Sequence, residues 1–247
     1  MRRNAPSGSS FSFGPGSMST AMQVLVGANV ALFVFQRIAP PITEWLGLIP
    51  GLVIHEFRVW QLVTYMFLHG GLFHILFNML ALWMFGTELE RRWGTRFFLK
   101  YYFVTGIGAG ALTVAFSLLP FGFAQQLQGV NIIGASGAIY ALLLAYAIYF
   151  PERPILLIVF FVPARICVMI LGAIALYSSL GESGGVANAT HLGGLLVGYL
   201  YLKGGRMTLS PFAEVKYRYV KWRINRLRRK FDVVAGGRSD HWDGRVH

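Results

Sequence analysis

Residues 131–143, NIIGASGAIYALL, decide how the chain is organised, because they place a single hydroxyl within a very apolar sequence. Ser136 has Gly134 and Gly137 close on either side and stands at the expected start of a helix. Small residues of this kind commonly let membrane helices pack closely together. Packing is therefore the first interpretation of Ser136, and the rest of the chain must support or overturn it.

The composition indicates a polytopic membrane protein. The 247 residues are 55% hydrophobic and 13% charged, with a mean hydropathy of +0.55, whereas soluble domains carry about 25% charged residues. Of the 22 Lys and Arg, 12 follow residue 202, so the net charge of +12 reflects a basic tail, and no nucleic-acid partner is expected. The single cysteine, Cys167, excludes an intrachain disulfide, and its apolar neighbours indicate a buried thiol.

Six apolar runs predict an all-α bundle of six membrane-spanning helices. They cover residues 20–36, 71–89, 97–117, 136–150, 166–181 and 190–203. Lys and Arg cluster after the second, fourth and sixth runs, whereas segments 118–135 and 182–190 contain none. This asymmetry predicts that both termini are cytoplasmic. The apolar stretch 154–163 is too short to cross, so we expect it to be interfacial or re-entrant.

Three regions are predicted along the chain. Residues 1–19 form a disordered cytoplasmic arm, residues 20–205 the six-span core and residues 206–247 a cytoplasmic tail. Tail residues Val220, Ile224, Leu227 and Phe231 recur at helical spacing among Lys and Arg. Such an amphipathic basic helix is suited to anionic lipid of the inner leaflet. A solvated tail without a partner is the alternative.

A depth calculation brings four polar side chains to one level. At about 1.5 Å per residue, Ser136 lies roughly 22 Å, Asn78 about 20 Å and His191 about 18 Å above the inner ends of their spans, with His74 one turn above Asn78. The fourth helix therefore starts below the outer surface, and its free N–H groups require the preceding loop to form a water-accessible cavity. Independent packing residues have no reason to share a level, so the packing interpretation of Ser136 is overturned.

These residue types suit nucleophilic catalysis. Serine is a weak nucleophile and needs an adjacent base, and histidine titrates near neutrality, so it can accept and return the proton. A helix start offers N–H groups and partial positive charge to a developing oxyanion. His74 and Asn78 are four residues apart, and therefore share one helical face.

Three motifs together resemble the rhomboid family of intramembrane serine proteases. They are GASGAIYAL with Ser136, HGGLFHILFNMLALWMFG with His74 and Asn78, and ANATHLGGLLVGYLY with His191. The resemblance covers about residues 20–205. It implies that Ser136 is the nucleophile, that His191 is its general base, and that His74 and Asn78 donate hydrogen bonds to the oxyanion, without a cofactor or metal.

The resemblance also implies supporting roles. Gly134 lets the loop turn before the serine, and Tyr140 packs against the catalytic histidine. Gly194 and Gly198 bring the sixth span against the fourth, and His69 makes structural hydrogen bonds. One departure from the family is visible: its first outer loop often carries adjacent Trp and Arg, whereas here Trp60 is followed by Gln61. We expect the missing hydrogen bonds to be lost or to be replaced by Arg58.

The expected function is hydrolysis of a peptide bond in or near the outer end of a transmembrane segment, in single-span membrane protein substrates. The simplest location is a bacterial inner membrane. Two alternatives remain open at this point. One is a non-catalytic relative that binds membrane spans. The other is a small transporter, which is disfavoured because the chain has no matching pair of broken helices.

Overall fold

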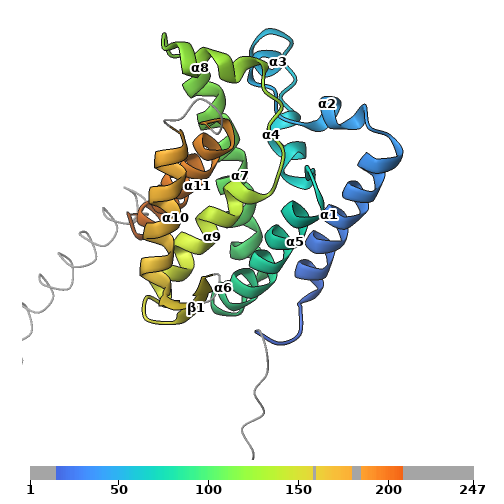
Figure 1. Cartoon of the computed structure of the whole chain (residues 1–247). Helices are drawn as coiled ribbons and strands as arrows, with labels where there is room; N and C mark the ends of the chain where they lie inside the picture. Colours follow the sequence, from blue (N-terminus) through green and yellow to red (C-terminus); the bar gives the residue numbers. More distant parts are fainter. Residues whose placement is uncertain (1–14, 158–159, 180–184, 208–247) are drawn as a thin grey trace, which may run out of the picture. The chain divides into compact units, whose positions relative to one another are not determined.

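A computed structural model describes residues 15–157, 160–179 and 185–207, and most of these residues are helical (Figure 1). Six helical stretches occupy the positions of the six predicted spans. They are α1 (Thr20–Ile38), α5 to α6 (Leu72–Trp93), α7 (Thr95–Ser117), α9 (Ser136–Tyr149), α10 (Ala164–Ser179) and α11 (Gly185–Met207). The predicted helical architecture is therefore confirmed within the described residues.

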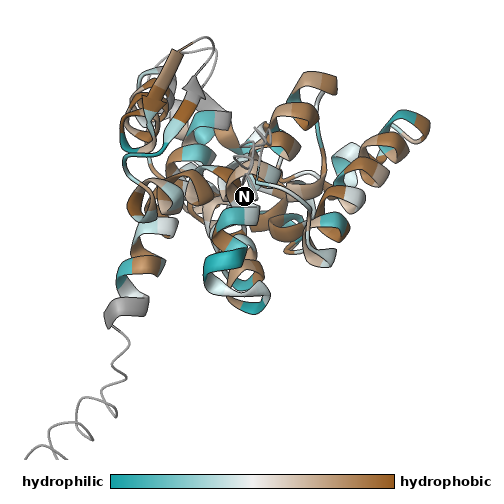
Figure 2. Ribbon diagram, turned by 90° about the horizontal axis from the view of Figure 1, so that it is seen from below, coloured by the Kyte–Doolittle hydropathy of each residue, from teal (hydrophilic) through white to brown (hydrophobic). Residues whose placement is uncertain are grey.

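Three of these helices are long and apolar enough to cross a membrane. They are Thr20–Ile38, Leu72–Trp93 and Thr95–Ser117, while Ser136–Tyr149 and the part Ala164–Ile174 of α10 are shorter apolar helices. Hydrophobic residues make up most of the ribbon (Figure 2), and large side chains such as Val34, Phe73 and Leu200 are exposed. The number of membrane crossings remains a prediction.

The second helical stretch is built in three pieces with one polar side. It consists of α5 (Leu72–Ala81), a π-helical turn η2 (Leu82–Gly86) and α6 (Thr87–Trp93). On α5, Phe73 and Phe77 are exposed while Asn78 is buried. The amphipathic pattern therefore turns the polar residues of this helix toward the interior of the bundle.

Two glycines of α11 let it approach α9 closely. A side chain at Gly194 would overlap the carbonyl of Gly137, and one at Gly198 would lie 2.9 Å from the Cβ atom of Ala141. The start of α9, which carries the Ser136 hydroxyl, is therefore held against the middle of α11 by close backbone contact.

Short elements connect the long helices at the Ser136 end. Between α1 and α5 lie α2 (Ile42–Leu46), α3 (Pro50–His55), α4 (Gln61–Thr64) and η1 (Tyr65–Phe67), and between α7 and α9 lie α8 (Gly122–Gln126) and η3 (Leu127–Gly129). Leu48 and Ile132 exchange two backbone hydrogen bonds of 2.9 and 2.8 Å. This bridge joins the first connection to the extended segment that precedes Ser136.

The stretch 154–163 adds a β-hairpin to an otherwise helical fold. Strands β1 (Pro154–Leu157) and β2 (Phe160–Pro163) pair in antiparallel register. Sequence length correctly argued against a spanning helix here, but the run of β-branched and aromatic residues favours strands. The predicted arm and tail fall mostly outside the described residues, apart from residues 15–19 and 206–207.

Candidate active site

The first turn of α9 and the first half of α11 bring one hydroxyl and one imidazole together. Ser136 Oγ lies 2.8 Å from His191 Nε2, and both residues are half-buried. At this distance the Ser136 hydroxyl can donate its hydrogen bond to an unprotonated Nε2. The two residues are 55 positions apart in sequence, so the contact depends on the packing of α9 against α11.

The ring of His191 is held on one face by Tyr140. The two ring centroids are 4.3 Å apart and the planes differ by 7°, which is a stacked arrangement. Nδ1 of His191 is buried and has no hydrogen-bond partner among the described residues. Stacking on Tyr140, and not a carboxylate on Nδ1, therefore orients this imidazole within the described part of the chain.

His74, on α5, lies near Ser136 and lines the same cavity. Its Nδ1 accepts a hydrogen bond of 3.2 Å from the backbone N–H of Gly70. A neutral imidazole has one protonated nitrogen, so this bond leaves the proton on Nε2. The Cε1 and Nε2 edge of the ring lies 2.9 Å from where a side chain on Gly134 would begin. A neutral His74 thus presents an N–H donor beside the segment that leads into Ser136.

Gly134 is required at its position for two independent reasons. Its φ of +128° belongs to backbone that residues with a side chain rarely adopt. A Cβ atom there would also collide with the ring of His74, 2.9 Å away. The backbone N–H of Gly134 donates to the carbonyl of Tyr65 at 2.9 Å, which fixes the turn.

Asn78 lies one helical turn from His74 but is oriented differently. It is buried, and its Nδ2 donates a 2.7 Å hydrogen bond to the carbonyl of His74 in its own helix. His74 lines the cavity beside Ser136, whereas Asn78 is not among the lining residues. One of the two amide hydrogens of Asn78 is therefore used within α5.

A cavity of about 260 Å³ lies against the serine. Its lining consists of Tyr65, His74, residues 130–134, Ser136 and Thr190. Sequence reasoning did not single out Tyr65 or Thr190. Thr190 directly precedes His191, and its hydroxyl lies 3.0 Å from that of Thr113, joining α11 to α7 through a buried hydrogen bond. The position of Thr190 directly before His191 was the one sequence feature that could have identified it as a site residue.

The first connection is braced by Gln61, so the hydrogen bonds expected to be lost or replaced by Arg58 are instead supplied by Gln61 itself. The fully buried Gln61 accepts a hydrogen bond of 3.0 Å from the Ile49 N–H, and its Nε2 lies 3.4 Å from the carbonyl oxygens of Glu44 and Trp45. Arg58 instead pairs with Glu56 at 2.6 Å. The Gln61 side-chain amide thus makes hydrogen bonds at the position where the family often has an arginine.

His69 differs from its expected role. Its backbone N–H donates to Gln36 Oε1 at 2.9 Å, but its two buried ring nitrogens have no hydrogen-bond partner among the described residues. The ring instead meets the ring of His74 edge-on, with centroids 5.0 Å apart. His69 therefore supports the position of His74 by packing. Within the described residues, no group of His, Cys, Asp and Glu has the arrangement of a metal site.

Comparison with known proteins places most of the chain in one family. A sequence model described as Rhomboid domain matches residues 56–206. RHOMBOID-like protein 1 of Arabidopsis thaliana is 32% identical over 198 residues, covering 70% of this chain and 46% of the relative. Rhomboid protein 1, mitochondrial, of Saccharomyces cerevisiae is 33% identical over 183 residues, covering 72% of this chain and 51% of the relative.

A bacterial protease is also similar. Rhomboid protease GlpG of Yersinia pestis is 33% identical over 147 residues, covering 58% of this chain and 47% of the relative. The chain thus spans about half the length of the curated relatives it matches.

Proposed function

The chain belongs to the rhomboid family, and from this premise we propose that it is an intramembrane serine protease. Its reaction is hydrolysis of a peptide bond in or near the outer end of a transmembrane segment, in single-span membrane proteins. The observation that carries the proposal is the 2.8 Å contact between Ser136 Oγ and His191 Nε2. A nucleophile within hydrogen-bond reach of a base is the arrangement that acyl transfer requires.

In the first step, Ser136 Oγ attacks the substrate carbonyl carbon while His191 Nε2 takes the hydroxyl proton. General base catalysis of this kind contributes about 10²–10⁴-fold. The stacked ring of Tyr140 supports the step, because it restricts rotation of the imidazole away from Ser136. The scheme uses two residues, Ser136 and His191. The His191 imidazolium forms without a carboxylate partner.

The negative charge that develops on the carbonyl oxygen requires hydrogen-bond donors. His74 Nε2–H is the primary side-chain donor, because Gly70 holds the other ring nitrogen as an acceptor. The backbone N–H of Ser136, at the start of α9, is a second donor. Asn78 supplies the amide hydrogen that it does not donate to the His74 carbonyl, which requires its side chain to rotate toward the cavity.

The reaction then proceeds through an acyl-enzyme. The His191 imidazolium returns its proton to the leaving amine nitrogen as the peptide bond breaks. A water molecule, deprotonated by His191, then attacks the ester carbonyl. The bond between the carbonyl carbon and Ser136 Oγ breaks, His191 returns the proton to Oγ, and the acyl fragment leaves as a carboxylic acid. Each step uses the same two residues and the same oxyanion donors, so no cofactor enters the scheme.

Substrate access requires the scissile segment to leave its helix. A helical amide is hydrogen-bonded within the segment and is shielded from Ser136 by its own side chains. Beyond Val168, α10 exposes large apolar side chains, including Met169, Ile174 and Tyr177. We propose that substrates approach Ser136 alongside this exposed part of α10.

The membrane orientation follows from charge. Basic residues follow α6 and α9 and crowd the tail, so we propose that both termini are cytoplasmic and that the Ser136 end faces outward. A bacterial inner membrane is the proposed location. Anionic lipid of the inner leaflet is the proposed partner of the tail, and nucleic acid is not.

The test is cleavage of single-span membrane protein substrates by the purified protein, with the cut mapped by mass spectrometry. We expect cleavage by the wild-type chain and none by Ser136→Ala or His191→Ala, each with an unchanged circular dichroism spectrum. Because the two residues act as a unit, the double variant is expected to be no worse than either single variant. Wild-type cleavage by Ser136→Ala would disprove the assignment.

A further inference from the structure

The β1–β2 hairpin is an element that the proposed protease mechanism does not use. Its register pairs Ile155 with Val162 and Leu157 with Phe160. Its base is closed by a 2.9 Å hydrogen bond from the Ala164 N–H to the Arg153 carbonyl. The two described strands therefore form an extension between α9 and α10, at the end of α9 opposite Ser136 (Figure 1).

The base of the hairpin is charged. Arg153 pairs with Glu88 of α6 at 3.2 Å, and Arg165 pairs with Glu152 at 2.9 Å. The guanidinium of Arg153 also lies over the ring of Phe150, 4.7 Å from its centroid. Each of these four charged side chains keeps between 23% and 66% of its surface exposed, so the base requires a polar environment.

The far end of the hairpin is apolar and uncovered by the described residues. Phe160 is 73% and Phe161 71% exposed, whereas Ile155 near the base is buried against the core. Consecutive residues of a strand point to opposite faces, so the two rings lie on opposite faces of the ribbon. Neither face of the far end is therefore packed against the described part of the bundle.

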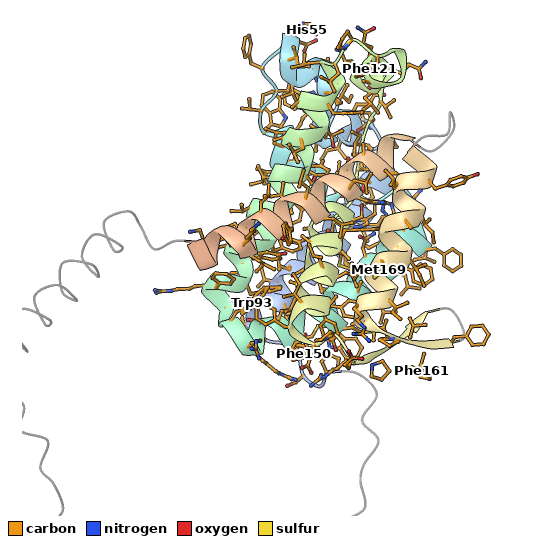
Figure 3. All side chains as sticks on the ribbon, turned by 90° about the vertical axis from the view of Figure 1, so that its left-hand side faces the viewer. His55, Trp93, Phe121, Phe150, Phe161 and Met169 are labelled. Atoms are coloured by element: carbon orange, nitrogen blue, oxygen red, sulfur yellow. The ribbon has the colours of Figure 1, made fainter. Side chains whose placement is uncertain are left out.

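This apolar end continues the apolar flank of α10. Ile166, Met169 and Ile170 on the first turns of α10 are exposed, and in a membrane-integral rhomboid protein such a flank faces lipid. Figure 3 shows Met169 and Phe161 on the same side of the molecule. The lipid-facing surface and the exposed rings are thus continuous.

We propose that the β1–β2 hairpin is an interfacial membrane anchor. Phe160 and Phe161 enter the boundary between headgroups and acyl chains, while Arg153 and Arg165 remain at the level of the lipid phosphates. Aromatic rings favour this boundary, and arginine can extend toward the headgroups. The hairpin is too short to span, so it enters and leaves the same leaflet.

The anchor has a consequence for α10, which begins directly after β2. Ala164, Cys167 and Val168 in its first turns are buried, whereas most of the described side chains beyond them are half-buried or exposed. A hairpin seated in the lipid boundary fixes the depth of this end of α10 in the bilayer. The proposal concerns the membrane contact alone, so it stands or falls independently of protease activity.

Depth-dependent fluorescence quenching tests the anchor. Cys167→Ala removes the native thiol, and Phe161→Cys or Glu152→Cys then introduces one labelling site at the far end or at the base. Each variant is labelled with an environment-sensitive dye and reconstituted into vesicles of phosphatidylcholine and phosphatidylglycerol that contain nitroxide-labelled lipids. We expect the dye at position 161 to emit at shorter wavelength and to lie about 5–10 Å below the headgroups, with the dye at position 152 outside them.

Two results would overturn the proposal. One is equal quenching of both dyes by aqueous iodide, which would place the far end of the hairpin in water. The other is a blue-shifted emission at position 161 that lipid nitroxides do not quench, which would mean that protein covers it. Phe160→Cys gives a second labelling site if Phe161→Cys does not fold, and both are expected to give the same depth.

Discussion

His74 provides the sharpest test of how charge is stabilised during the proposed reaction. We predict that His74→Ala lowers kcat by about 10²–10³-fold, because losing one oxyanion donor costs roughly 2.7–4 kcal/mol of transition-state stabilisation. The KM is expected to change little, since the donor acts only once negative charge appears on the carbonyl oxygen. His74→Gln is expected to recover part of the loss, because its amide offers a donor from the same helix position.

The structure predicts a smaller effect for Asn78. Its Nδ2 already donates to the His74 carbonyl at 2.7 Å, and it does not line the cavity beside Ser136. We therefore expect Asn78→Ala to lower kcat by about tenfold, equivalent to 1.36 kcal/mol. This hydrogen bond lies within α5 and joins no second helix, and even hydrogen bonds between membrane helices average only about 0.6 kcal/mol. Thermal unfolding should therefore barely change.

The assay is steady-state cleavage of a fluorogenic single-span substrate in detergent, together with thermal unfolding of each variant. Phe73→Ala is a matched control, because Phe73 lies next to His74 on α5 but is 72% exposed. It is expected to retain the wild-type kcat. A wild-type kcat in His74→Ala would refute the donor role of Nε2. A larger loss in Asn78→Ala than in His74→Ala would show that the amide is the principal donor.

Two variants and one tail peptide test other parts of the account. Gly134→Ala is expected to abolish cleavage of the fluorogenic single-span substrate, because a methyl group would collide with His74 and strain the positive φ; normal turnover would contradict that packing. Gln61→Leu should destabilise the protein by about 1–3 kcal/mol in thermal unfolding by leaving buried backbone groups unpaired, whereas an unchanged Tm would show that Gln61 does not brace the loop. The third test uses a peptide of residues 212–231 in which four basic residues are neutralised, Arg226, Arg228, Arg229 and Lys230. Each lost charge should weaken binding to anionic vesicles by about 1 kcal/mol, and equal binding would exclude an electrostatic role for the tail.

The helices and the meeting of Ser136 with His191 could be predicted because both depend on regular geometry. Apolar runs mark the positions of the helices, and a fixed rise per residue places side chains on parallel helices at equal depth. The prediction that α9 starts at Ser136 is confirmed. Ser136 and His191, which the depth calculation places at one level in the membrane, have side-chain atoms 2.8 Å apart.

Features that depend on irregular backbone could not be predicted in the same way. The stretch 154–163 was predicted to be interfacial or re-entrant, but its two strands were not predicted, because a brief apolar run does not distinguish a strand from a helix. The bracing by Gln61 depends on which backbone groups of residues 44–49 come within reach, which no periodicity encodes. The orientation of Asn78 depends on a side-chain rotation that spacing leaves free.

The central claim is that Ser136 is a nucleophile activated by His191. The most direct measurement is labelling of the purified protein with a fluorophosphonate probe, followed by peptide mass spectrometry. We predict one adduct per chain on Ser136, no adduct in Ser136→Ala and greatly slowed labelling in His191→Ala. An adduct on another residue, or equal labelling of wild-type and Ser136→Ala chains, would contradict the account.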